Sequence, residues 1–271
     1  MRIAILLYGQ PRSYLNGHEL IRKFLANQTN VEVDFLYHCW TITPGDYFPC
    51  SPWRNISKSE LEYNPDTPDR LRELYNPVAF LYEPQIMDFN KNLYENTLCY
   101  NNTTGREREN VNNTLSQMYS LNAARNILNS YIENTGTAYD YVVVYRFDGS
   151  DSEKLLTVDL SNLTDSLYLG NTHRPRNIFT AHLLIAPPHI ILKMLNFFSR
   201  LQDLIDNPMI FQLMSGIWEH MHINMENIAT AKYLLEYGDL HLCTFKTPII
   251  DVKKITKRSL RISRHGILIF P

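Results

Sequence analysis

The sequence has no long apolar run and almost no net charge. No apolar stretch approaches the roughly 20 residues that a membrane-spanning helix needs, so membrane contact would have to be peripheral. The 26 lysine and arginine residues nearly balance the 28 aspartate and glutamate residues, which excludes a general positive field for nucleic acid. An anion-binding site would therefore have to be built from a few local side chains.

Cysteine is also scarce. The four cysteines are Cys39, Cys50, Cys99 and Cys243. Their wide spacing excludes the short paired patterns of a zinc site or a disulfide framework and favours a reducing compartment. The apolar stretch at residues 3–7 is shorter than a signal-peptide core and is followed by GQPR, not by a small-residue cleavage site. We therefore expect a cytoplasmic protein.

The chain shows no internal repeat, heptad pattern or Gly/Ser linker, so we expect its 271 residues to form a single domain. Apolar periodicity predicts an α/β fold with a mostly parallel, Rossmann-like central sheet flanked by helices. Strands are expected at about 3–8, 31–40, 78–82, 142–145, 166–170, 183–186 and 240–245. Helices are expected at about 15–26, 69–74, 115–134, 190–204, 209–221 and 225–237, and a polar loop at 101–113.

The most informative segment is AYDYVVVYRFDGSD, at residues 138–151. Its run of valine and tyrosine is typical of a strand buried on both faces of a sheet. Asp148 would then follow the carboxyl end of a central strand, where open α/β sheets bind ligands. A carboxylate there can hold a divalent metal beside a phosphorylated ligand. Alternatively, Asp148 and Asp151 simply form a polar turn.

Four short motifs occur in order along the first half of the chain: GQPR, VDFLYHCW, SQMYSLNAARNIL and YDYVVVYRFD. Together they resemble the GT-A-type glycosyltransferases of surface-polysaccharide and large-DNA-virus glycan synthesis. The similarity is greatest to the xylosyltransferase-like enzymes that build chlorella-virus capsid glycans. It implies a GT-A-like fold, with residues 1–150 binding a nucleotide-sugar and residues 151–271 binding the acceptor. For a viral protein the cytoplasm would be that of the host.

The resemblance implies transfer of one sugar, such as xylose, from a nucleotide-diphosphate-sugar donor to a hydroxyl of an oligosaccharide or glycoprotein glycan. It further implies a UDP-linked donor, inversion of configuration, and Mn²⁺ or Mg²⁺ as cofactor. Asp148 would be the metal ligand that corresponds to the last carboxylate of the family's Asp-x-Asp motif. Arg146 stands where the first carboxylate is usual, and it could instead pair with Asp148 or contact phosphate.

Several residues are candidates for holding the donor: Gly9, Gln10, Arg12, His38, Asn122, Arg125 and Arg146. The first three follow the first strand, where backbone amides and a guanidinium can meet phosphate. His38 lies near the end of the second strand, and Asn122 and Arg125 share one face of the helix before the acidic turn. The alternatives are an ordinary strand-to-helix turn at 9–12 and a solvated arginine at 125.

Inversion requires a base that deprotonates the acceptor hydroxyl, and a carboxylate is the usual group. Glu226 is the first candidate because it matches an acidic position in the similar enzymes and opens a predicted helix. Its rivals are Asp151, Asp206 and Glu219. A zinc site around Glu219, His220, His222 and Glu226 is disfavoured because the HExxH order is absent. The basic segment at 253–265 either forms a solvated face or closes over the diphosphate.

Two further functions remain open from the sequence. Arg146, together with the lack of a carboxylate in RNIFTAHLLIA, is compatible with a non-catalytic carbohydrate-binding or virion-associated protein on a degenerate glycosyltransferase fold. A nucleotidyltransferase would share the sheet but usually has a glycine-rich phosphate loop, which GQPR matches poorly.

Overall fold

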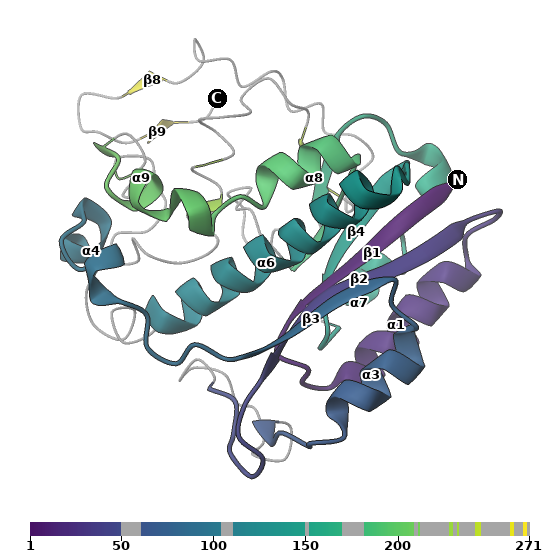
Figure 1. Ribbon diagram of the computed structural model, residues 1–271. Helices are drawn as coiled ribbons and strands as arrows, with labels where there is room; N and C mark the ends of the chain where they lie inside the picture. The colour runs from purple at the N-terminus through teal and green to yellow at the C-terminus, as the bar shows by residue number, and fades with distance from the viewer. Residues whose placement is uncertain are drawn as a thin grey trace.

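The computed structural model describes residues 1–49, 61–103, 111–149, 152–169 and 182–208, together with 211, 228–229, 232, 242–244, 261–262 and 268–269. The described residues form an α/β structure in which helices cover a mixed, mostly parallel sheet (Figure 1). No helix among them is both long and apolar enough to cross a membrane.

The central sheet has seven strands in the order β3-β2-β1-β4-β6-β5-β7. Their bounds are β1 Arg2–Gly9, β2 Glu32–Thr41, β3 Ala79–Pro84, β4 Tyr141–Arg146, β5 Leu167–Leu169, β6 Leu183–Ala186 and β7 Leu242–Thr244. Strands β3, β2, β1 and β4 run parallel, whereas β6 runs antiparallel to both of its neighbours. A separate antiparallel pair joins β8 (Arg261–Ile262) to β9 (Leu268–Ile269).

The helices are α1 Tyr14–Ala26, α3 Thr67–Tyr75, α4 Leu98–Asn102, α6 Val111–Thr135, α7 Ser152–Leu155, α8 Pro188–Met194 and α9 Leu201–Ile205. Short 3₁₀ turns lie at Lys91–Leu93 (η1), Leu160–Asn162 (η2) and Phe198–Arg200 (η3). Helices α6 and α8 cover one face of the sheet, and α1 and α3 cover the other (Figure 1).

Successive residues of each strand enter opposite cores because side chains alternate along a strand. In β1, Leu6 and Tyr8 pack with α6, whereas Ile5 and Leu7 pack with α1 and α3. Both sets are almost fully buried. This two-sided burial confirms the prediction of an α/β sheet whose central strands are buried on both faces.

The predicted helix at 190–204 is divided into α8, η3 and α9. Leu195 and Phe197 are both fully buried in the core beside α6. In a continuous helix they would point about 200° apart, since each residue advances by roughly 100°. Ending α8 at Met194 allows both side chains to reach the same core.

The polar loop expected at 101–113 is partly helical, because α6 begins at Val111. Val111 and Thr114 are buried, which extends the apolar face one turn before Leu115. The helices predicted at 209–221 and 225–237 lie mostly outside the described residues, as does most of the basic segment. The GT-A-like assignment and the two functional halves of the domain stay predictions.

The chain extends the sheet from β1 in two directions. Strands β2 and β3 are added on one side of β1, and β4 is added on the other. Helix α1, which follows β1, and helix α6, which precedes β4, lie on opposite faces. The direction in which strands are added therefore reverses between β1 and β4, and such a switch point is where open α/β sheets bind ligands.

Candidate functional site

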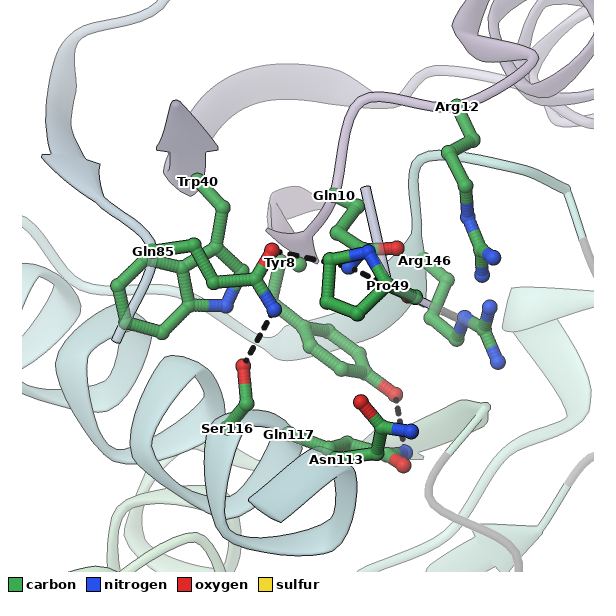
Figure 2. Close-up of a pocket in the computed structure, with 11 residues that line it drawn as sticks. Tyr8, Gln10, Arg12, Trp40, Pro49, Gln85, Asn113, Ser116, Gln117 and Arg146 are labelled. Atoms are coloured by element: carbon green, nitrogen blue, oxygen red, sulfur yellow. Dashed lines mark hydrogen bonds between the residues drawn. The ribbon is translucent and has the colours of Figure 1, made fainter. Parts of the chain in front are cut away.

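A polar cavity of about 110 Å³ lies at this switch point, beyond the carboxyl ends of the parallel strands (Figure 2). Tyr8 and Gly9 line it from the end of β1, Trp40 from β2, and Arg146 from β4. Gln85 reaches it from the residue after β3. Tyr8 lies opposite Arg146 in the β1–β4 ladder, so parallel pairing brings the ends of both strands to one edge.

Helix α6 supplies the wall on its face of the sheet through Asn113, Ser116 and Gln117. These residues lie in the first two turns of the helix. The helix leads into β4, so it runs antiparallel to the strands and begins at their carboxyl edge. These residues were not predicted, because the apolar pattern begins at Leu115 and the candidate ligands on this helix, Asn122 and Arg125, lie near its middle. Because this helix leads into β4, its first turns must lie at the carboxyl edge of the sheet, and that direction could have identified the lining residues.

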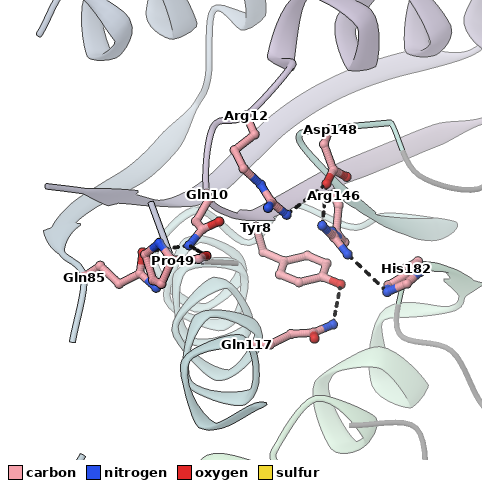
Figure 3. A network of polar contacts seen from close by, with 9 residues as sticks. All are labelled: Tyr8, Gln10, Arg12, Pro49, Gln85, Gln117, Arg146, Asp148 and His182. Atoms are coloured by element: carbon pink, nitrogen blue, oxygen red, sulfur yellow. Dashed lines mark hydrogen bonds and ion pairs between the residues drawn. The ribbon is translucent and has the colours of Figure 1, made fainter. Parts of the chain in front are cut away.

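At one end of the cavity, Arg12 and Arg146 meet at Asp148 (Figure 3). Asp148 Oδ2 accepts a hydrogen bond from Arg12 Nη2 at 3.4 Å and another from Arg146 Nη2. The three side chains are only 9%, 12% and 17% exposed, respectively. Two positive charges therefore face one negative charge in a site with little solvent to screen them.

Arg146 is also held from the side opposite Asp148. Its Nη1 lies 3.2 Å from His182 Nε2, just before β6. A guanidinium can only donate hydrogen bonds, so Nε2 is the acceptor in this contact. The guanidinium of Arg146 is thus held by contacts with both Asp148 and His182.

The turn that carries Asp148 is fixed by its neighbours in the chain. Phe147 is fully buried in the core beside α1 and α3, so Arg146 and Asp148 are left on the opposite side. The Gly149 amide donates to the Arg146 carbonyl at 3.2 Å, and Gly149 has a φ of 68°. Glycine adopts this backbone conformation without steric cost. Beneath the turn, a Cβ at Gly17 of α1 would lie 2.0 Å from the Phe147 carbonyl oxygen, so this close approach requires glycine.

The other end of the cavity is lined by amides. Gln10 Nε2 donates to the Pro49 carbonyl at 3.1 Å and to Gln85 Oε1 at 2.9 Å. Gln85 Nε2 in turn donates to Ser116 Oγ at 3.1 Å. Figure 2 shows the Tyr8 ring between this end and the arginines, and its hydroxyl accepts from Gln117 Nε2 at 3.4 Å. Such groups suit the hydroxyls and carbonyls of a sugar or a base.

His38 supports the cavity without lining it. Burial lowers the pKa of His38 to about 4, against the opposing effect of Glu83. The ring is therefore neutral at pH 7, with Nε2 donating to Glu83 Oε2 at 3.2 Å and Nδ1 accepting from Ser120 Oγ at 2.7 Å. Ser120 Oγ then accepts from the Gly9 amide at 2.9 Å. His38 lies two residues before Trp40, deep enough for α6 to cover it.

Asn122 and Arg125 do not line the cavity. Arg125 Nε donates to the Leu192 carbonyl at 2.5 Å and Nη1 donates to Asn126 Oδ1 at 2.9 Å, so Arg125 joins α6 to α8. Asn122 Oδ1 is buried without a hydrogen-bond partner. Arg125 is eight residues beyond Gln117, or about 12 Å along the helix axis. Arg125 is not a solvated arginine either, because its side chain is half-buried and its guanidinium donates to the Leu192 carbonyl.

The described residues do not fit a divalent metal ion. No group of three histidine, cysteine, aspartate or glutamate side chains converges among them. Asp148 contributes an oxygen that both arginines already contact, and two guanidinium groups repel a cation. The expected Mn²⁺ or Mg²⁺ stays a prediction.

Of the four candidate bases, the structure describes only Asp206. Glu226, Asp151 and Glu219 lie outside the described residues. Asp206 follows α9, and its Oδ1 accepts from the Leu98 amide at 3.1 Å. That bond connects α9 to α4, away from the cavity lining. The role of Glu226 as base stays a prediction.

A second, larger cavity of about 510 Å³ lies between β3 and α6. It is lined largely by apolar side chains such as Phe80, Leu81 and Tyr131, and none of its described lining residues is lysine or arginine. Its size falls within the roughly 300–1,000 Å³ of small-molecule sites, whereas the polar cavity is smaller. We favour the polar cavity as the site of an anionic ligand, because Arg12 and Arg146 line it. The binding of an anion depends more on nearby positive charge than on the volume of the cavity.

The sequence matches no protein-family model and no curated protein. Function must therefore be inferred from the residues of the cavity.

Proposed function

We propose that this protein is a glycosyltransferase of GT-A-like fold that transfers one sugar from a nucleotide-diphosphate-sugar, UDP-linked, to a hydroxyl of a glycan acceptor. The observation that carries this proposal is the pair Arg12 and Arg146, two largely buried guanidiniums at the switch point of the sheet. Two guanidiniums side by side favour an anion that has several oxygens and more than one negative charge. A diphosphate is an anion of matching charge.

The layout of the cavity supports a ligand that is anionic at one end and polar but uncharged at the other. Arg12 and Arg146 would hold the diphosphate, and Gln10, Gln85 and Gln117 would meet the hydroxyls or carbonyls of the attached groups. Gly9 permits close approach, because the space around its Cα is open and its φ is 98°. Since about 110 Å³ is too small for an entire nucleotide-sugar, the remainder would extend over the open side.

In this proposal the arginines also assist the reaction. When the bond between the sugar and the diphosphate breaks, negative charge grows on the departing oxygen. Guanidiniums that already face this position stabilise the charge without rearrangement, which is a major source of catalysis in buried sites. Glu226 stays the candidate base on the acceptor, within the proposed acceptor-binding half at residues 151–271.

A second candidate function is a non-catalytic protein that binds carbohydrate or nucleotide-sugar. The observation that favours it is the absence of a carboxylate among the described residues that line the cavity. Asp148 lies beside the cavity, but both arginines contact it. Such a protein would bind the donor without consuming it.

A melting-temperature panel followed by a turnover assay tests the proposal. A ligand that binds only the native state raises the melting temperature. We expect nucleoside diphosphates and their sugars to raise it and bare nucleosides to leave it unchanged. Release of free sugar or nucleoside diphosphate from a stabilising donor would support an enzyme, whereas binding without release, even with glycan acceptors present, would support the second candidate.

A further inference from the structure

Arg12 and Arg146 hold a carboxylate of the protein itself at the place where a phosphate would bind. We propose that Asp148 is a built-in anion that occupies the Arg12–Arg146 pair until the donor's diphosphate displaces it, and that this exchange needs no divalent cation. The inference rests on the proposed function, since it takes the ligand to be a nucleotide diphosphate.

The first support is the way in which the three groups meet. A guanidinium is a planar fork that matches two oxygens of a carboxylate or phosphate. Asp148 instead presents one atom, Oδ2, to both arginines, and its contact with Arg12 Nη2 is long at 3.4 Å. A diphosphate offers several oxygens, so each guanidinium could contact its own pair. The internal anion is therefore a poorer partner than the proposed ligand.

The second support is charge. Among these three side chains, two positive charges face one negative charge. A diphosphate would bring about two negative charges near the arginines where the carboxylate brings one, so its attraction to the two guanidiniums would be stronger. A divalent cation on Asp148 Oδ2 would instead lie beside two guanidiniums and be repelled by both. The residues thus suit direct contact with the anion better than contact through a metal.

The third support is that the arginines are held in place while Asp148 lies in a turn. His182 holds Arg146 from one side, and Arg12 is only 9% exposed. Asp148 is the most exposed of the three and is followed by Gly149 at a φ of 68°. A change of its side-chain rotamer would break the contacts of Oδ2 with both arginines. The binding groups would then be ready before the ligand arrives.

Isothermal titration calorimetry in EDTA, with inorganic pyrophosphate, UDP and uridine as probes, tests the inference. We expect pyrophosphate and UDP to bind the wild-type protein without metal and uridine to bind at least about tenfold more weakly than UDP, a difference that one charged contact can supply. Mn²⁺ should change the affinity for UDP by less than about twofold. Asp148→Asn should bind UDP and pyrophosphate several-fold more tightly, because the competing anion is gone. Arg146→Gln should bind both at least about tenfold more weakly.

The chain offers a matched control at the opposite edge of the sheet. Arg2 Nη2 and Asp34 Oδ2 form an ion pair at 2.7 Å, and Arg2 is the first residue of β1. Arg2→Gln and Asp34→Asn remove the same charges far from the cavity and should leave both affinities unchanged. Arg146→Lys serves if Arg146→Gln does not fold, since it keeps the charge but loses the fork and should weaken binding to a smaller extent.

The outcomes separate this inference from the proposed function. Sugar transfer that requires Mn²⁺ and is lost in Asp148→Asn would overturn the exchange while supporting a glycosyltransferase. Metal-free binding of pyrophosphate and UDP with the expected variant pattern, but without turnover of any nucleotide-sugar, would support the exchange and count against an enzyme. Failure of the wild-type protein to bind either anion, with or without Mn²⁺, would overturn both.

Discussion

Gly17→Ala should disturb the turn that carries Asp148, although residue 17 lies in a helix and does not line the cavity. A Cβ at this position would lie 2.0 Å from the Phe147 carbonyl oxygen, 3.0 Å from the Phe147 carbonyl carbon and 3.3 Å from the Gly149 nitrogen. These are backbone atoms, so no side chain can rotate away to make room. The contact between α1 and the turn would have to open by about 1 Å to reach the shortest distance that packed Cβ atoms tolerate.

Two opposing terms set the size of the effect. Alanine is favoured over glycine inside a helix by about 0.8–1.0 kcal/mol. Forcing a methyl group into a packed site costs about 1–3 kcal/mol, and a clash with backbone belongs at the upper end of that range. We therefore expect a net loss of about 2 kcal/mol, which lowers the melting temperature by roughly 4–8 °C for a chain of this size. Because the turn moves, UDP affinity in EDTA should also fall by about tenfold, equivalent to about 1.4 kcal/mol.

Thermal melting and titration calorimetry measure the two effects separately. Asn16→Ala is the matched control, because residue 16 is exposed in the same helix and gains helix propensity without a clash. It should melt at or slightly above the wild-type temperature and bind UDP normally. If Gly17→Ala also melted at or above the wild-type temperature with unchanged UDP affinity, α1 would not hold the turn as described.

The remaining predictions concern α6 and its neighbours. Arg125→Gln should lower the free energy of unfolding by about 1.5–3 kcal/mol in denaturant titrations, because a charged hydrogen bond to Leu192 is lost, and should leave UDP affinity unchanged; a specific loss of UDP affinity would return Arg125 to the site. Gln117→Ala should weaken UDP binding more than pyrophosphate binding in calorimetry, since Gln117 contacts Tyr8 beyond the arginines; equal weakening of both would contradict the two-ended cavity. His38 has a folded pKa of about 4, below its ordinary value of 6.5, so the unfolded chain takes up the proton first. The titration of His38 therefore adds no pH dependence to stability above pH 6.5, and as pH falls toward 4 the free energy of unfolding should decrease by up to about 3 kcal/mol. His38→Gln should make that decrease shallower in melts across the same pH range, and an unchanged slope would show that other groups cause it.

The central strands could be predicted because both of their faces are buried. The run Val142, Val143 and Val144 leaves no polar position in the middle of β4, and the structure buries all three residues almost completely. Helices α1 and α3 were predicted to within two residues for a related reason, since each buries one face. The division of the 190–204 segment could not be read in the same way. A periodic pattern shows which residues are apolar. It does not show that Leu195 and Phe197, which would point about 200° apart on a continuous helix, must enter the same core.

The site residues at the ends of strands could be predicted from the sequence, whereas those on helix α6 were not. Gly9, Gln10, Arg12 and Arg146 line the cavity because they follow or end β1 and β4. His38 was expected to help hold the donor, but it lies two residues before Trp40, or about 6.6 Å along β2, and does not line the cavity. His38 is buried because α6 packs over it, and Ser120 of that helix lies more than 80 residues away in the sequence. No local sequence pattern encodes this packing.

Residue 146 illustrates how one position can set the character of the whole crevice. It ends β4, so alternation directs its side chain toward the face of the sheet that α6 covers, the face to which Val142 and Val144 contribute. Parallel pairing places it opposite Tyr8, four residues before Arg12. A carboxylate at 146 would join Asp148 in a negatively charged pair and attract a cation. An arginine there joins Arg12 instead, and both guanidiniums contact Asp148. In the proposed function, the choice between a metal-binding crevice and an anion-binding one therefore depends on the sign of a single side chain at the end of β4.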